Sequence, residues 1–318
     1  MQRILSLFPV FLFVLCASSS ASAQNDSTLA ANLQSMIAGF QGDVSLYAHD
    51  LTTGRTVAID ADRPVPTASV IKLGILYTAL EQIRAGRAHF DERLTLRHQD
   101  QVGGSGVLQF FDTPMSLTLK DALTMMIAES DNTATNLVID RLGLTAIDDQ
   151  LEALGMKNTW LYKKIEIPTE GRMPADQKQF GLGKTTAREM AGLMERFVNC
   201  NLGPAPAVAP GTASDVPADG ALCAAALHML KIQFYRDGIP RYLARLDPAK
   251  GDSAIANKTG ALDHVRNDVA AVYTKRGVLV ISVFTHNNAD TSWMADNQAL
   301  VLTARLAQAI VAAWAPGV

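Results

Sequence analysis

A serine and a lysine with the chemistry of a nucleophile and its base lie three positions apart in the segment S-V-I-K, residues 69–72. If a helix begins at Ser69, the hydroxyl of Ser69 and the amine of Lys72 share one face of it. The residues that follow are nearly all apolar, which predicts a buried helix. Burial lowers the pKa of a lysine, so Lys72 becomes a possible base for the hydroxyl. Taken alone, the segment is more typical of a helix cap followed by a lysine that reaches solvent.

Two further motifs change this interpretation. S-D-N at 130–132 lies between two predicted helices, and K-T-G at 258–260 lies on a predicted strand. The order S-x-x-K, S-D-N, K-T-G is the set of class A β-lactamases and penicillin-binding proteins. With these motifs the sequence resembles the class A serine β-lactamase family and related serine hydrolases over residues 26–315. The segment K-T-T-A-R-E-M-A-G-L-M at 184–194 also resembles the end of that family's omega loop.

The resemblance implies a role for each matching residue. Ser69 matches the nucleophile that is acylated, and Lys72 the buried lysine that helps to take its proton. Ser130 matches the serine that passes a proton to the leaving lactam nitrogen. These roles fit the needs of acyl transfer, which are an activated hydroxyl, a proton donor and fixed dipoles for the oxyanion. The matching substrate-binding groups are Asn132 for the side-chain amide, Lys258, Thr259 and Gly260 for the carboxylate and the wall of the site, and the backbone N–H groups of Ser69 and Ala261 for the oxyanion.

The residue that would release the acyl group is less well defined. The family uses an omega-loop glutamate, followed four residues later by an asparagine. Glu166, preceded by Lys164, is the better candidate, but Glu170 stands where the asparagine is expected. Lys184 occupies the place of a family aspartate, so the family's Arg–Asp clasp of the loop is not visible in the sequence. Three possibilities follow: the base is Glu166, the base is Glu170, or neither carboxylate reaches the site.

The expected function is therefore hydrolysis of the amide of β-lactam antibiotics through a serine acyl-enzyme. The alternatives are a D-alanyl-D-alanine peptidase, an esterase, or a sensor that is acylated and stays so. The six histidines form no short metal-ligand motif, and we expect neither a metal nor another cofactor. The net charge of −3 argues against a nucleic-acid partner. The expected partner is a small-molecule β-lactam, and we expect a monomer.

The first 23 residues have the pattern of a signal peptide. Arg3 precedes an apolar run over 4–16, and A-S-A at 21–23 is a typical cleavage site. We expect a periplasmic or secreted protein without a stable membrane anchor, because the apolar run is too short to span a bilayer. In an oxidising compartment Cys200 and Cys223 can pair. Two separate buried thiols are the alternative, and pairing is slightly favoured because a bridge would tie down the loop between them.

The predicted elements suggest an α/β fold with an antiparallel sheet built from both chain ends. We expect one serine β-lactamase-like domain over 24–318, with its sheet part at about 24–66 and 250–318 and an inserted helical part at about 67–249. The segment Q-V-G-G-S-G-V-L-Q at 101–109 is interpreted as a surface loop, since no Lys-Ser/Thr follows it as in a phosphate-binding loop. The cleft between the two parts is the expected site. The expected helices cover 26–40, 69–85, 118–128, 132–142, 145–154, 185–199, about 222–235 and 292–314, and the expected strands cover 43–50, 55–60, 253–260, 268–275 and 278–286.

Overall fold

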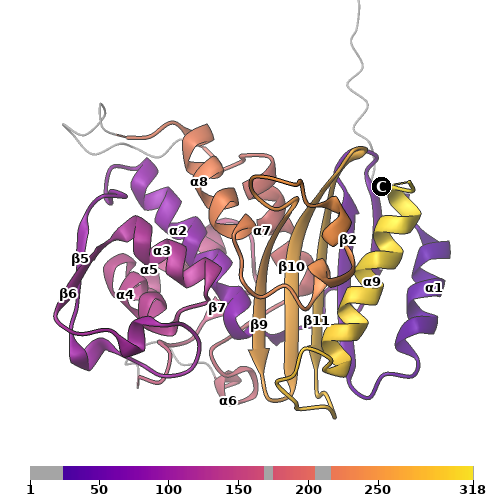
Figure 1. Cartoon of the computed structure of the whole chain (residues 1–318), viewed down its shortest axis with the longest axis horizontal. Helices are drawn as coiled ribbons and strands as arrows, with labels where there is room; N and C mark the ends of the chain where they lie inside the picture. Colours follow the sequence, from indigo (N-terminus) through magenta and orange to yellow (C-terminus); the bar gives the residue numbers. More distant parts are fainter. Residues whose placement is uncertain (1–23, 168–174, 205–215, 318) are drawn as a thin grey trace, which may run out of the picture.

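A computed structural model describes residues 24–167, 175–204 and 216–317. Its main sheet has six strands in the order β1-β3-β2-β11-β10-β9, with only the β1–β3 pair parallel. The early strand β2 pairs with the late strand β11, so both ends of the chain build one sheet (Figure 1). This confirms the expected fold class. The strands are β1 (Gln24–Asn25), β2 (Asp43–Asp50), β3 (Arg55–Ile59), β9 (Ile255–Leu262), β10 (Val265–Thr274) and β11 (Gly277–His286).

The sheet is covered on both faces. Helices α1 (Ser27–Ile37) and α9 (Gln298–Trp314) pack on one face, and α7 (Ala187–Val198) packs on the other (Figure 1). Alternate residues of β10 therefore enter different cores, as the two-residue period of a strand requires. Burial on both faces explains why the central strands are almost continuously apolar rather than alternating.

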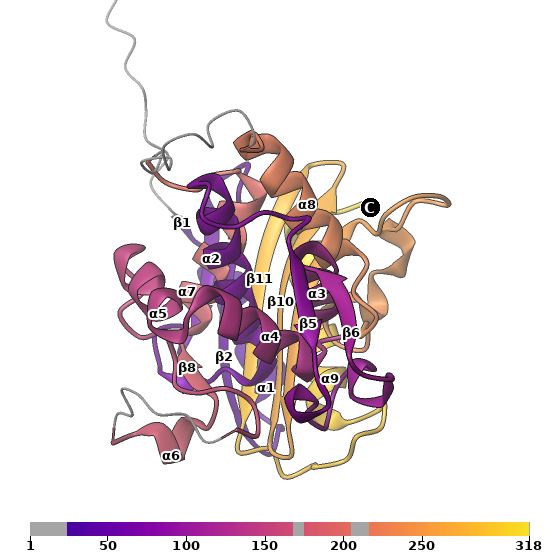
Figure 2. The same ribbon diagram turned by 90° about the vertical axis from the view of Figure 1, so that its left-hand side faces the viewer.

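The middle of the chain forms a helical layer in front of the sheet (Figure 2). Its helices are α2 (Lys72–Arg84), α3 (Leu119–Ala128), α4 (Asn132–Leu142), α5 (Leu144–Ala153), α6 (Gln177–Phe180) and α8 (Asp219–Lys231). The 3₁₀ turn η1 (Ala68–Ile71) leads into α2, and further 3₁₀ turns lie at His98–Asp100, Leu108–Phe110, Ile239–Tyr242 and Ala244–Leu246. Two small sheets combine β4 (Val65–Pro66), β8 (Gly183–Thr185) and β7 (Trp160–Leu161), and β5 (Arg93–Leu96) with β6 (Met115–Thr118).

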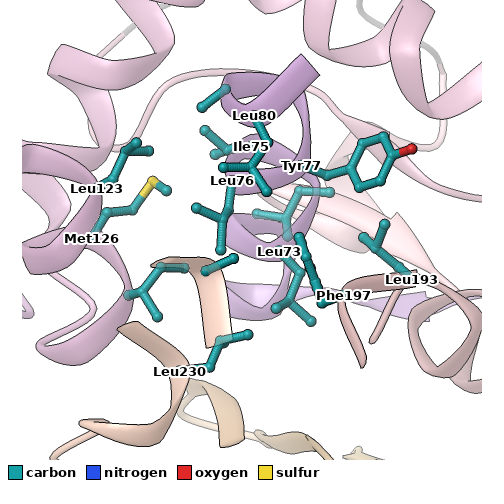
Figure 3. Close-up of a cluster of buried hydrophobic side chains, with 14 of the residues drawn as sticks. Leu73, Ile75, Leu76, Tyr77, Leu80, Leu123, Met126, Leu193, Phe197 and Leu230 are labelled. Atoms are coloured by element: carbon teal, nitrogen blue, oxygen red, sulfur yellow. The ribbon is translucent and has the colours of Figure 1, made fainter. Parts of the chain in front are cut away.

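Helix α2 is the centre of the larger core. Every one of its residues is buried, as its apolar sequence predicts. Figure 3 shows its side chains between α3, α7 and α8, where Leu123, Phe197 and Leu230 meet it. A helix held on all sides is a rigid support, so the residues at its start are fixed in space.

Several boundaries follow from caps that the sequence contains. The side chain of Asp131 accepts the backbone N–H of Ala134 and starts α4 at Asn132. Helix α9 begins at Gln298 rather than at 292, because Asn297 caps it. The expected helix over 222–235 is observed at Asp219–Lys231. The two small sheets are not among the predicted elements.

Cys200 and Cys223 form a disulfide between the end of α7 and α8, which confirms the favoured pairing. Within the part of the chain that the structure describes, no helix has the length and apolar character to cross a membrane. The signal peptide predicted at 1–23 lies outside that part. It remains a prediction, as do the bounds of the two subdomains.

Candidate active site

The turn that carries Ser69 is wedged between α2 and the edge strand β9. Ser69 lies in the 3₁₀ turn η1, and Lys72 is the first residue of α2. Side chains three residues apart eclipse each other in a 3₁₀ turn, so the two still share a face. Ser69 is partly exposed, and its hydroxyl makes no hydrogen bond to any other described residue. That hydroxyl is therefore free to meet a substrate.

Lys72 is fully buried at the base of the site. Its Nζ donates to Ser130 O at 2.6 Å, to Ser130 Oγ at 3.1 Å and to Asn132 Oδ1 at 3.1 Å. Burial, and next the charge of Lys258, lower the pKa of Lys72 well below its usual value, while Asp131 opposes the shift. A lysine with a lowered pKa can take a proton near neutral pH.

A second buried lysine reaches the same serine from the opposite side. Lys258 Nζ donates to Ser130 Oγ at 3.0 Å and to Thr259 O at 2.8 Å. Burial lowers the pKa of Lys258 to about 7, opposed by the Asp268 carboxylate. A hydroxyl oxygen has two acceptor sites, so Ser130 Oγ can accept from both lysines and still donate its own proton. The arrangement therefore directs the Ser130 proton away from both lysines and into the site.

Strand β9 comes so close to η1 that only glycine fits at position 260. A Cβ there would lie 2.8 Å from Thr67 O and 3.0 Å from the backbone nitrogens of Ser69 and Val70. The amide of Asn267, on β10, donates to Thr67 O at 3.2 Å and holds the same contact. In the described part of the chain β9 is the edge of the sheet, so one side of its backbone pairs with no other strand.

The loop over 101–109 is a wall of the site and not only a surface loop. Asp131, almost fully buried, accepts the backbone N–H groups of Val107 at 2.8 Å and Leu108 at 2.9 Å. Asn132 donates its amide to Gly103 O at 3.0 Å. The S-D-N motif thus fixes this loop, and its composition of Gly and Ser gave no sign of that role.

Glu166 lies at the mouth of the site rather than at its base. Its side chain is exposed, and Oε2 accepts the Gly103 N–H at 3.0 Å. Asn136 holds the neighbouring peptide through two 2.9 Å hydrogen bonds to Ile165. Among the described residues, no hydrogen bond joins the Glu166 carboxylate to Ser69 or Lys72. Glu170 lies outside the described residues.

The omega-like loop has a clasp that differs from the Arg–Asp pair of the resembled family, as the sequence indicated. Lys184 Nζ lies 2.6 Å from Asp176 Oδ2, and the Tyr162 hydroxyl donates to Asp176 Oδ1 at 2.8 Å. Lys164 pairs instead with Asp140 of α4, at 2.8 Å. In this clasp the acidic residue precedes the basic residue in the sequence, which is the reverse of the family's Arg–Asp order.

Backbone strain gathers near these residues. Ala68, Ser130 and Glu166 have φ values of 43°, 55° and 56°, in the left-handed region that non-glycine residues seldom occupy. Each such residue costs about 1–3 kcal/mol and persists only where its surroundings impose it. No group of three or more metal-ligating side chains occurs in the described ranges. A groove of about 380 Å³ between the end of α5 and α7 contains none of the candidate residues.

The fold, with three distant motifs brought together at one site, is of the β-lactamase and penicillin-binding-protein type. The sequence profile of the Beta-lactamase enzyme family matches residues 28–314, and the chain belongs to this family. A β-lactamase from Sphaerobacter thermophilus is 29% identical, with a TM-score of 0.72 over 90% of this chain and 97% of that chain. The structure of PBP-A, 23% identical with a TM-score of 0.72 over 92% and 98% of the two chains, shares the fold.

Curated relatives match over shorter stretches. Beta-lactamase SME-1 of Serratia marcescens is 22% identical over 185 residues, 57% of this chain and 62% of that protein. Beta-lactamase regulatory protein BlaB of Streptomyces cacaoi is 26% identical over 137 residues, 42% of this chain and 44% of that protein. The matches therefore span less than two thirds of either relative.

Proposed function

We propose that this protein is a β-lactamase that hydrolyses the lactam amide through an acyl-enzyme at Ser69. Ser69 Oγ attacks the lactam carbonyl carbon, and its proton passes to the neutral amine of Lys72. As the tetrahedral intermediate collapses, the C–N bond breaks and the nitrogen takes the proton of Ser130 Oγ. Lys72 then returns a proton to Ser130, so the charges balance. The backbone N–H groups of Ser69 and Ala261 are the proposed donors to the oxyanion.

The observation that carries this proposal is the hydroxyl of Ser130, which accepts hydrogen bonds from two buried lysines, Lys72 and Lys258. One lysine must be largely neutral there, because two buried like charges close together are strongly unfavourable. The pKa of Lys72, lowered well below its usual value, suits it to be the neutral one. Lys258 remains as the cation for the substrate carboxylate, with Thr259 and Gly260 beside it and Asn132 for the side-chain amide.

Release of the acyl group is assigned to Glu166, which would activate a water molecule. The Gly103 contact gives a reason to keep a second candidate function. A carboxylate held at the mouth of the site would leave the acyl-enzyme long-lived, as in a D-alanyl-D-alanine peptidase-like enzyme or an acylated sensor. An esterase that uses the same serine is a further possibility. With the signal peptide predicted at 1–23, we place the protein in the periplasm or outside the cell, where it would confer antibiotic resistance.

A chromogenic cephalosporin distinguishes these functions. Purified protein should give sustained turnover, and mass spectrometry of the quenched reaction should show an adduct on Ser69. A single burst with a stable adduct would contradict the β-lactamase and support the second candidate. Ser69→Ala should remove both burst and turnover.

Glu166→Gln and Glu170→Gln assign the base. If Glu166 is the base, Glu166→Gln should leave the burst but slow turnover by at least roughly 100-fold, since general base catalysis contributes about 10²–10⁴-fold. Glu170→Gln is the matched control and should turn over like the parent protein. The reverse result would make Glu170 the base. Turnover like that of the parent protein in both variants would exclude both glutamates.

A further inference from the structure

Two buried aspartates flank the lysine pair, one behind each wall of the site. Asp131 and Asp268 are each 1% exposed. Asp131 accepts backbone N–H groups of the 101–109 loop, as described above. A Cβ on Gly106 of that loop would lie 2.2 Å from Asp131 Oδ2, so the loop backbone rests directly on the carboxylate. The charge of Asp131 also opposes the lowering of the pKa of Lys72.

Asp268 repeats this arrangement on the other wall. Its Oδ2 accepts the backbone N–H of Ile239 at 2.8 Å, and its Oδ1 accepts Asn257 Nδ2 at 3.0 Å. A Cβ on Gly238 would lie 2.5 Å from Asp268 Oδ2. The segment 233–239, which follows α8, therefore rests on Asp268 as the 101–109 loop rests on Asp131.

The strand register brings Asp268 close to Lys258. Asp268 on β10 pairs with Thr259 on β9. Lys258 Nζ donates to the carbonyl of this same Thr259 at 2.8 Å. Paired residues of antiparallel strands have Cα atoms about 4.5–5.5 Å apart and share a face of the sheet, so Asp268 lies with Thr259 on the face opposite to Lys258. The two buried charges are thus close through the sheet, and each shifts the pKa of the other.

Resting on the proposed function, we propose that Asp268 is a positioning residue, whose buried carboxylate is the counter-charge of Lys258 and the anchor of the segment 233–239 beside it. A buried cation needs a nearby anion to remain charged, and substrate binding in the proposed function needs Lys258 charged. Asp131 fills the corresponding place for Lys72. On each side of the site, the aspartate that anchors the loop segment is thus also the counter-charge of the lysine.

The other charges around the pair are few. Lys258 donates to Ser130, and its charge adds to burial in lowering the pKa of Lys72. The charges of Lys258 and Arg236 both act to lower the pKa of Asp268, and Arg236 pairs with Asp247 at 2.8 Å. Burial raises the pKa of Asp268 to about 6, opposed by the Asn257 and Ile239 hydrogen bonds, so at neutral pH the carboxylate is mainly charged. Removing it leaves Lys258 without its principal buried anion.

The test is an NMR titration of Lys258 in the full chain labelled with ¹³C-lysine, with the signal assigned by its loss in Lys258→Arg. Asp268→Asn should lower the pH at which Lys258 titrates by about one unit, because a nearby opposite charge shifts a pKa by about 1–3 units. Asp237→Asn is the matched control, since Asp237 is exposed in the same segment and carries the same charge. It should leave the Lys258 titration unchanged.

The exchange variant Asn257→Asp/Asp268→Asn keeps the hydrogen-bonded amide–carboxylate pair. It moves the carboxylate from β10 to β9, where it stands next to Lys258 in the sequence. It should return the titration toward that of the parent protein. An unmoved titration in Asp268→Asn, or no return in the exchange variant, would overturn the proposal. If Asp268→Asn does not fold, Asn257→Asp alone decides, since an added carboxylate must raise the Lys258 titration.

The pH dependence of Ser69 acylation by penicillin G, followed by mass spectrometry, separates this proposal from the proposed function. Its alkaline limb should move to lower pH in Asp268→Asn, together with the NMR titration. Absence of any adduct on the parent protein would contradict the proposed function, while the NMR result would still decide the role of Asp268. An adduct with an unmoved alkaline limb in Asp268→Asn would contradict the proposed role of Asp268.

Discussion

Substituting Gly260 by alanine tests how closely β9 must pack against the turn that carries Ser69. The three atoms nearest to the new Cβ, at 2.8–3.0 Å, are all backbone atoms of residues 67–70. A backbone atom cannot rotate away as a side chain can. Ordinary van der Waals contact begins at 3.4 Å, so strand and turn must separate by roughly half an ångström.

This displacement has two expected consequences. Overpacking in a well-packed region costs about 1–3 kcal/mol, so the free energy of unfolding should fall by that amount. A functional constellation tolerates displacements of only about 0.5 Å, and a 1 Å misplacement can cost about 100-fold in rate. Acylation in Gly260→Ala should therefore be roughly 10- to 100-fold slower.

Single-turnover kinetics with a chromogenic cephalosporin and urea denaturation measure the two effects separately. Gly192→Ala is the control, because a Cβ at this position in the middle of α7 would have no heavy atom within 4 Å apart from its chain neighbours and the backbone of its own helix. It should leave acylation unchanged and stabilise the protein by up to about 1 kcal/mol. Parent-like acylation in a destabilised Gly260→Ala would refute the claim that β9 sets the position of the nucleophile.

Three further predictions concern the clasp, the disulfide and pH. Lys184→Met removes the partner of Asp176, so it should slow release of the acyl group more than its formation; equal effects on burst and steady state would contradict this. Replacing Cys200 and Cys223, 23 positions apart, by serine should lower the free energy of unfolding in urea by about 3 kcal/mol and leave acylation intact. Because the pKa of Lys258 is about 7 and only its protonated form binds a carboxylate, acylation by penicillin should decline above about pH 7; the penicillin methyl ester should lack this decline, and a shared decline would assign it to another group.

The sequence predicts the elements whose signals are local. Helix α4 occupies the predicted range 132–142, because Asp131 caps its start and Gly143 ends it. The hairpin β10–β11 joins the two strands predicted at 268–275 and 278–286, since both are long and β-rich. The nucleophile turn required three motifs far apart in the chain, and only their order suggested that they meet.

Features set by contacts between distant segments escaped prediction. The 101–109 loop has the composition of a surface loop, and its role depends on Asp131, which is more than 20 residues away. Asp268 is the third of three consecutive polar residues on β10, and its place opposite Thr259, the neighbour of Lys258, follows only from the register of β9 and β10. The small sheet of β4, β7 and β8 has strands of two or three residues, too short for any period to be visible.

The groups proposed for acyl-enzyme formation and the residue proposed for its release have very different surroundings in this fold. The groups proposed for acylation are buried or lie on elements packed from several sides, so a shift in one must disturb the core. Glu166 is exposed, and within the described residues its carboxylate accepts one hydrogen bond, from the Gly103 N–H, while Asn132 also holds Gly103. A substrate amide that takes the Asn132 side chain would compete with Gly103 O, and so would disturb the contact that positions Glu166. Release is thus the step in which members of this fold can differ while the fold and the acylation site stay the same.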